Sequence, residues 1–80
     1  MLLKDIESKA IRIIEEALSY STNEIKKEHN LESDLHMDKL DIVEIIMDLE
    51  EEFNIDISDE EMEEFSTVQS IINCVESKIE

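Results

Sequence analysis

The stretch from Asp38 to Phe53 constrains the fold more than any other, because it lacks Pro and Gly and repeats apolar residues at helical spacing. Its side chains separate into distinct sectors when each residue turns the helix by about 100°. One sector is apolar and must be buried, and it contains Ile42, Ile45, Ile46, Leu49 and Phe53. Another is a stripe of carboxylates that no lysine on the same helix neutralises, formed by Asp41, Glu44, Asp48 and Glu51.

Two apolar residues of this helix, Leu40 and Met47, lie between the acidic stripe and the buried face. An acidic stripe beside a small apolar strip suits docking against a basic partner surface that has an apolar pocket. The competing interpretation is a solvated face on a soluble helix, and periodicity alone slightly favours it.

The length of 80 residues allows a single domain over 1–80 with one modest core, because small domains bury only roughly 60% of their unfolded surface. The formal net charge of -16 excludes nucleic acid and anionic membranes as electrostatic partners and leaves basic proteins or cations. Self-repulsion at this charge predicts that salt or divalent cations stabilise the fold.

Three further features bear on location. The single cysteine cannot form an internal disulfide, which fits a reducing cytosol. The first residues lack the apolar segment of a signal peptide, and no apolar run approaches the length of a membrane span. We therefore expect a cytoplasmic monomer without a membrane span.

The first half of the chain predicts one helix followed by a loop. Apolar residues recur at three- and four-residue intervals from position 2 or 3 to about position 19, which indicates an amphipathic helix. The pattern then breaks up, and a short helical turn is expected around 23–27. The resulting loop over 20–37 is expected to attach to the core through Ile25, Leu31 and Leu35.

Helix ends can be predicted from capping residues. Asp38 is the expected N-cap of the central helix, and Asp41 supports the positive end of its dipole. Asn54 can adopt the left-handed conformation that ends a helix in a chain without Gly. Ser58 and Glu61 form a capping box that opens a short helix.

The short helix is expected to run to about Phe65, with Met62 as its other apolar contact. The segment Ser66–Gln69 repeats the capping-box pattern and predicts the start of the last helix. The inward face of that helix contains Val68, Ile71, Ile72, Val75 and Ile79. No segment resembles a useful strand, so the pattern predicts an all-α fold, a compact helical bundle.

Four segments carry a resemblance to a known family: Asp38–Glu44, Leu49–Phe53, Ile57–Glu61 and Ser66–Gln69. In this order they resemble acyl carrier proteins of the bacterial fatty-acid type, over about residues 31–80. The family's pattern is Asp-Ser-Leu-Asp opening the second helix, an acidic run ending in Phe, then Ile-Pro-Asp-Glu-Glu, then Thr-Val-Gln. The resemblance implies a four-helix bundle of three long helices and one short helix, with a long loop between helices 1 and 2.

The chain departs from the family at the attachment position. Where the family has the Ser that carries 4'-phosphopantetheine, this chain has Lys39, and an amine cannot form the phosphodiester. Ser33 lies outside the motif and is not a substitute. His36-Met37 replaces the Gly that commonly precedes the motif, and Ser58 replaces the family's Pro. We therefore expect no phosphopantetheine cofactor on this sequence.

Lys39 has two competing explanations. It is an engineered substitution that locks a genuine acyl carrier of lipid or natural-product synthesis in its unmodified state, or it marks a natural paralogue that kept only the docking surface. Direct acylation of the Lys39 amine is the weakest idea, because an ammonium near carboxylates stays protonated and is a poor nucleophile.

The resemblance also implies which residues partner enzymes recognise, with acids meeting Arg and Lys of the partner. These are Asp38, Leu40, Asp41, Val43, Glu44, Met47, Glu50, Glu51, Met62 and Glu63. The family sequesters acyl chains between its helices, which here would involve Ile42, Val43, Ile46, Leu49, Ile57, Met62, Phe65 and Val75. Without an arm to deliver a chain, we interpret this second set as ordinary core.

Other sites are disfavoured. His29 and His36 lack partners for a zinc site, and Cys74 fits a small, partly buried side chain. Weak calcium or magnesium binding is the most that we expect of the surface carboxylates. These are Glu50, Glu51, Glu52, Asp56, Asp59, Glu60 and Glu61. No nucleophile pairs with a base, so we expect no enzyme. The predicted function is docking on basic surfaces of acyl-metabolism enzymes or of a phosphopantetheinyl transferase.

Overall fold

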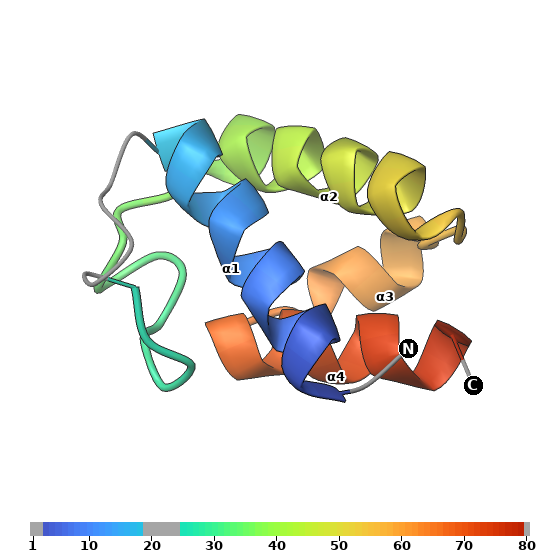
Figure 1. The fold of residues 1–80 in the computed structure, drawn as a ribbon. Helices are drawn as coiled ribbons and strands as arrows, with labels where there is room; N and C mark the ends of the chain where they lie inside the picture. The colour runs from blue at the N-terminus through green and yellow to red at the C-terminus, as the bar shows by residue number, and fades with distance from the viewer. Residues whose placement is uncertain (1–2, 19–24, 80) are drawn as a thin grey trace.

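Four helices form in the predicted order in the computed structural model, which describes residues 3–18 and 25–79 (Figure 1). They are α1 (Leu3–Leu18), α2 (Lys39–Phe53), α3 (Asp59–Glu63) and α4 (Val68–Ile79). The prediction of three long helices and one short helix is therefore confirmed. Within those residues there is no strand beyond a single isolated bridge between Asn30 and Thr67.

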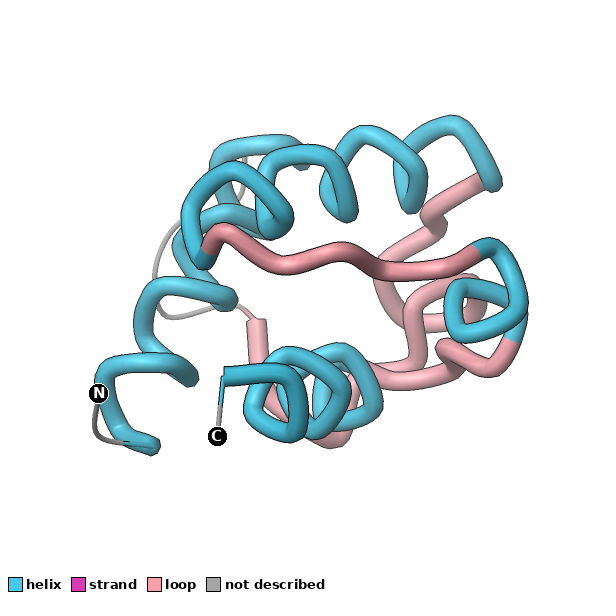
Figure 2. Tube along the Cα trace, turned by 90° about the vertical axis from the view of Figure 1, so that its right-hand side faces the viewer, coloured by secondary structure: helices cyan, strands magenta, loops and turns pink. Residues whose placement is uncertain are grey.

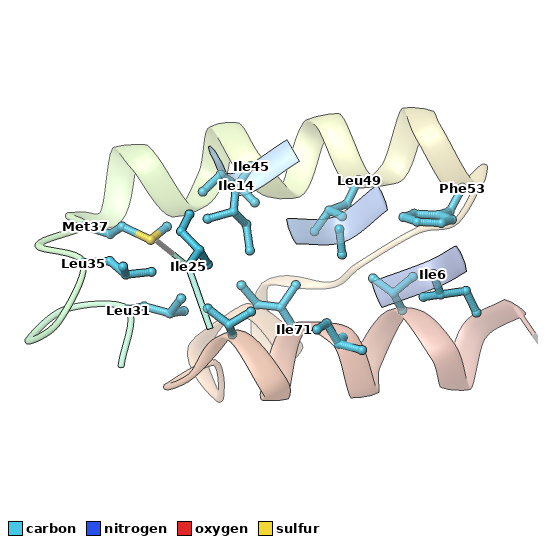
Figure 3. Close-up of a cluster of buried hydrophobic side chains, with 14 residues drawn as sticks. Ile6, Ile14, Ile25, Leu31, Leu35, Met37, Ile45, Leu49, Phe53 and Ile71 are labelled. Carbon is cyan, nitrogen blue, oxygen red and sulfur yellow. The ribbon is translucent and has the colours of Figure 1, made fainter. Parts of the chain in front are cut away.

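The core lies between α2 and α4, and α1 packs against both of them (Figures 1 and 3). Every long helix contributes because each has one apolar face at helical spacing. The buried cluster contains Ile6, Ala10, Ile14, Ile25, Leu31, Leu35, Met37, Ile45, Leu49, Phe53, Val68, Ile71, Ile72 and Val75. None of the helices in the described ranges is long and apolar enough to cross a membrane.

Both ends of α2 form as the local sequence predicts. Asp38 caps the N-terminus in a reciprocal box, in which Asp41 N donates to Asp38 Oδ1 at 2.9 Å and Asp38 N donates to Asp41 Oδ2 at 3.2 Å. Asn54 ends the helix in the left-handed conformation, with φ 54° and ψ 52°. After Asn54 the chain runs back alongside α2 to α3 (Figure 2).

The loop before α2 is attached to the core by the three predicted residues, Ile25, Leu31 and Leu35, all of which are buried (Figure 3). Met37 is buried as well, at 4% exposed, and the sequence did not indicate it. The helical turn expected around 23–27 is not found in the described part, where residues 25 and 26 are irregular and a turn covers 27 and 28. Positions 23 and 24 lie outside the described residues.

Backbone hydrogen bonds fix this loop to the start of α4. Leu31 N donates to Ser66 O at 2.9 Å, Val68 N donates to His29 O at 3.1 Å, and Gln69 N donates to Lys27 O at 2.9 Å. These bonds satisfy polar groups that the loop would otherwise leave unpaired beside the core.

The predicted capping box at Ser66 and Gln69 is wrong by one residue. Because α4 begins at Val68, Thr67 is the residue that precedes it, and Thr67 Oγ1 accepts from Ser70 N at 3.2 Å. The Ser70 hydroxyl accepts in return from Thr67 N at 3.1 Å. The side chain of Gln69 instead donates to Asn73 Oδ1 at 2.8 Å.

Two smaller expectations also need correction. The short helix ends at Glu63, two residues before the expected Phe65, whose N–H makes only a turn bond to Met62 O at 3.2 Å. The helical pattern predicts that Ile42 is buried, but it is half-buried, because it packs against the edge of the core and lines a surface pocket.

Candidate functional site

Two apolar residues on the outer face of α2, Leu40 and Met47, are exposed to solvent. Leu40 is 77% exposed and Met47 is 60% exposed, and they are the large hydrophobic residues that remain exposed in the described part of the chain. Exposed apolar side chains contribute to binding when a partner covers them, since contiguous apolar patches commonly mark interaction sites.

Carboxylates surround these two residues. Glu44, Asp48 and Glu51 are exposed, and within residues 3–18 and 25–79 no lysine or arginine forms an ion pair with them. Asp38 is exposed and Asp41 is half-buried, and both use one oxygen in the capping box. The acidic stripe therefore keeps its negative potential toward solvent.

Four residues of the expected partner-binding set are half-buried, namely Asp41, Val43, Glu50 and Met62. Glu50 is half-buried, and its Oε2 accepts a hydrogen bond from Ile57 N at 2.9 Å, which ties α2 to the link that leads to α3.

A pocket of about 380 Å³ lies at the N-terminal end of α2 and brings Asp38 together with the α3 residues Met62 and Glu63. It is lined by Glu32, Asp38, Lys39, Ile42, Met62, Glu63 and Phe65. Lys39 is exposed and is the first helical residue of α2. None of the lining residues carries a hydroxyl group, and Ser33 lies in the turn over 31–35 without lining the pocket.

The residues that the resemblance implies for acyl sequestration divide into two groups. Ile46, Leu49 and Val75 are buried, at 5%, 0% and 0% exposed. The other five, Ile42, Val43, Ile57, Met62 and Phe65, are half-buried. Of the whole set, Ile42, Met62 and Phe65 line the surface pocket.

A polar cluster between α3 and α4 was missed by the sequence reasoning. Glu61 Oε1 accepts from Lys78 Nζ at 2.9 Å and from Ser58 N at 3.0 Å, and Glu61 Oε2 accepts from Cys74 Sγ at 3.5 Å. The four-residue spacing of Cys74 and Lys78 places them on one face of α4, but no local pattern relates them to Glu61.

These contacts shift the pKa of each member of the cluster. The pKa of Glu61 falls from 4.5 to about 2, chiefly because the Ser58 N–H and then the Lys78 ammonium stabilise the carboxylate. Partial burial raises the pKa of the Cys74 thiol, and the hydrogen bond and negative charge of Glu61 raise it further. The hydrogen bond to Glu61 raises the pKa of Lys78.

The histidines have local roles. His29 Nδ1 accepts from Lys26 N at 3.1 Å within a turn, and His36 adopts the left-handed region with φ 56°. Among the described residues, no group of three or more His, Cys, Asp or Glu is arranged to hold a metal ion.

A small four-helix bundle with an acidic, partly apolar second helix is the architecture of carrier domains. The chain matches the family of the phosphopantetheine attachment site over residues 8–75. It is 44% identical over 77 residues to an acyl carrier protein of Buchnera aphidicola subsp. Baizongia pistaciae (strain Bp), covering 96% of this chain and 99% of that protein. The chain therefore belongs to the acyl carrier protein family, whose members carry 4'-phosphopantetheine and act as carriers rather than catalysts.

Solved structures show the same fold. The crystal structure of an acyl carrier protein from Thermotoga maritima has a TM-score of 0.82 and 26% identity, covering 96% of this chain and 89% of that chain. The solution structure of the apo doublet acyl carrier protein from prodigiosin biosynthesis has a TM-score of 0.81 at 16% identity, covering 94% of this chain and 36% of that one. The second likeness concerns the fold alone.

Proposed function

We propose that this chain docks on enzymes of fatty-acid or related acyl metabolism through α2 and does not itself carry phosphopantetheine. The observation that carries the docking proposal is the exposure of Leu40 and Met47 beside acids that form no ion pair within the described residues. The proposed docking face contains Asp38, Leu40, Asp41, Val43, Glu44, Met47, Glu50, Glu51, Met62 and Glu63.

Charge and apolar contact have separate roles in this proposal. The acids attract a basic partner over about 10 Å at 0.1 M salt, which accelerates encounter and orients the two surfaces. Leu40 and Met47 then bury apolar area against the partner, which slows dissociation. Binding should accordingly weaken as salt rises without disappearing.

The absence of a hydroxyl at the pocket supports the second half of the proposal. In members of the family, phosphopantetheine is attached to the side-chain oxygen of a Ser. The residue at that position in this chain is Lys39. A lysine in the first turn opposes the helix dipole by only about 0.3–1 kcal/mol. The capping box of Asp38 and Asp41 offsets part of this cost, so the fold accommodates either residue.

Intact mass spectrometry tests the loss of the arm. The chain is incubated with coenzyme A and a broad-specificity phosphopantetheinyl transferase, and we expect no mass gain. The Lys39→Ser variant is the matched control, and it should gain the mass of one phosphopantetheine if the docking face is still recognised. A mass gain on the unaltered chain would overturn this part of the proposal.

Charge reversal tests the docking face. In the Lys39→Ser background, Glu44→Lys with Glu51→Lys should raise the KM of the transferase for the carrier by at least about tenfold, since two attractive contacts become repulsive. The control, Asp5→Lys with Glu28→Lys, changes the net charge equally at exposed positions outside α2 and α3. Equal effects of the two pairs would mean that overall charge, and not this face, governs recognition.

The Lys39→Ser variant also distinguishes a genuine acyl carrier from an adaptor that kept only the docking surface. A genuine acyl carrier whose Ser was replaced should regain modification at the KM of ordinary carriers. An adaptor that kept only part of the surface should be modified with a much higher KM.

A further inference from the structure

The helix α3 contributes two residues, Met62 and Glu63, to the proposed docking face. It has only five residues, and none of them is buried. A helix this short is unstable alone, because the cost of nucleating a helix exceeds what one or two turns recover. Its position must therefore be determined by contacts with the rest of the molecule.

Apolar packing holds the segments on either side of α3, where Ile57 and Phe65 contact the core, but none of the five residues of the helix itself is buried. On the α2 side, the pocket of about 380 Å³ separates Met62 and Phe65 from Ile42 and Lys39. On the α4 side, a second hollow of about 360 Å³ lies beside Phe65 and Cys74, lined by Glu61, Glu64, Phe65, Ser70, Asn73, Cys74 and Ser77. An element with open space on two sides lacks the close packing that fixes core helices.

Polar contacts at Glu61 connect the helix itself to α4. Glu61 Oε1 accepts from Lys78 Nζ at 2.9 Å and from the backbone and hydroxyl of Ser58, each at 3.0 Å. Its other oxygen accepts from Cys74 Sγ at 3.5 Å. One carboxylate thus joins the start of α3 to two successive turns of α4.

From this geometry we infer that Glu61 and Lys78 are positioning residues, which hold α3 so that Met62 and Glu63 complete the docking face. The inference rests on the proposed function, since it concerns the α3 part of the same face. Lys78 acts through Glu61, because Lys78 itself lines neither the pocket nor the face. Without the Lys78 contact, α3 keeps its capping box and the weaker Cys74 contact but loses the ion pair that holds it at a fixed distance from α4.

Lys78→Met tests the inference because it retains most of the aliphatic stem and leaves the capping box of Ser58 and Glu61 intact. We expect amide hydrogen exchange over residues 59–65 to become about three- to tenfold faster, with exchange in α2 and α4 unchanged. In the Lys39→Ser background, the KM of the broad-specificity transferase for the carrier should rise by a similar factor, while kcat stays within about twofold.

Two variants serve as controls. Lys78→Arg preserves the ion pair and should restore both exchange and KM. Lys9→Met breaks an ion pair between α1 and α2, Lys9 Nζ to Glu52 Oε2 at 3.7 Å, and should change neither. Thermal unfolding of each variant checks that the bundle remains folded.

The inference is overturned if Lys78→Met leaves the exchange of residues 59–65 unchanged, or if exchange accelerates while KM stays the same. Neither result would affect the charge-reversal test on α2. Conversely, if Glu44→Lys with Glu51→Lys has no effect on KM, the proposed docking face fails, whereas faster exchange in Lys78→Met would still establish the link between α3 and α4.

Discussion

His36 adopts a backbone conformation that suits glycine. Its φ of 56° lies in the left-handed region, where a side chain with a Cβ is disfavoured by roughly 1–2 kcal/mol. It stands three residues before Lys39, in the segment where the family commonly has Gly. The residue is exposed, so its side chain gains little packing that would offset this cost.

His36→Gly should therefore stabilise the protein by about 0.5–1 kcal/mol, somewhat less than the strain removed, because Gly also makes the unfolded chain more flexible. Urea denaturation with an unchanged m-value measures the effect. Ser33→Gly is the control, since Ser33 is exposed and lacks a positive φ. That variant should be destabilised, and stabilisation of both variants would mean that φ is not the cause.

The depressed pKa of Glu61 predicts a pH dependence of stability. Because the pKa of the folded state, about 2, lies below its usual value of 4.5, the carboxylate stabilises the fold above that value and loses this effect as pH falls toward 2. The stability difference between the protein and Glu61→Gln should be largest above about pH 5 and should close near pH 2. Glu64→Gln is the comparison, since its carboxylate makes none of the Glu61 contacts, and a pH-independent difference for Glu61→Gln would contradict the assignment.

At the scale of elements, α2 is the helix that the sequence describes most completely. Asp38, Asn54 and four of the five expected buried positions were predictable, because capping and amphipathic periodicity are local properties. The start of α4 was misplaced because Ser66 and Gln69 match the usual capping-box pattern, while Thr67 and Ser70 do not. The hydrogen bond from Ile57 to Glu50 could not be foreseen, since it depends on how the link turns back.

The contribution of the Glu50 hydrogen bond to stability can be measured by comparing a substitution at Glu50 with the same substitution at Glu51. Glu50→Ala should lower stability by about 1 kcal/mol, because Ile57 N loses its partner in a half-buried setting. Glu51→Ala removes the same atoms from the same helix at an exposed site and should change stability by less than about 0.5 kcal/mol. Equal values from chemical denaturation would show that the bond contributes nothing.

For the molecule as a whole, repulsion between like charges is an unfavourable term. The net charge is -16, and the ion pairs found among the described residues are Lys9 with Glu52, Lys27 with Glu7, and Lys78 with Glu61. The bundle and its core could be predicted, because apolar spacing determines which faces are buried. The position of α3 could not, because it depends on contacts between Glu61 and a distant helix.

Raising sodium chloride from about 0.01 M to about 0.5 M should raise Tm, because the Debye length shrinks from about 30 Å to a few Å. If screening removes about 1 kcal/mol of repulsion, Tm rises by about 4–8 °C in a domain of this size. Asp5→Lys with Glu28→Lys brings the charge from -16 to -12, since each change adds two, and should reduce the response. A Tm that is insensitive to salt would exclude self-repulsion as a major cost.

The backbone bonds between the loop ahead of α2 and the start of α4 connect positions about half the chain apart. During translation, the acceptor on Ser66 and the donors on Val68 and Gln69 are made long after their partners. The loop therefore lacks these partners until the start of the last helix has left the ribosome. A nascent chain would accordingly keep an unfinished surface until residues 66–69 have been made and have left the ribosome.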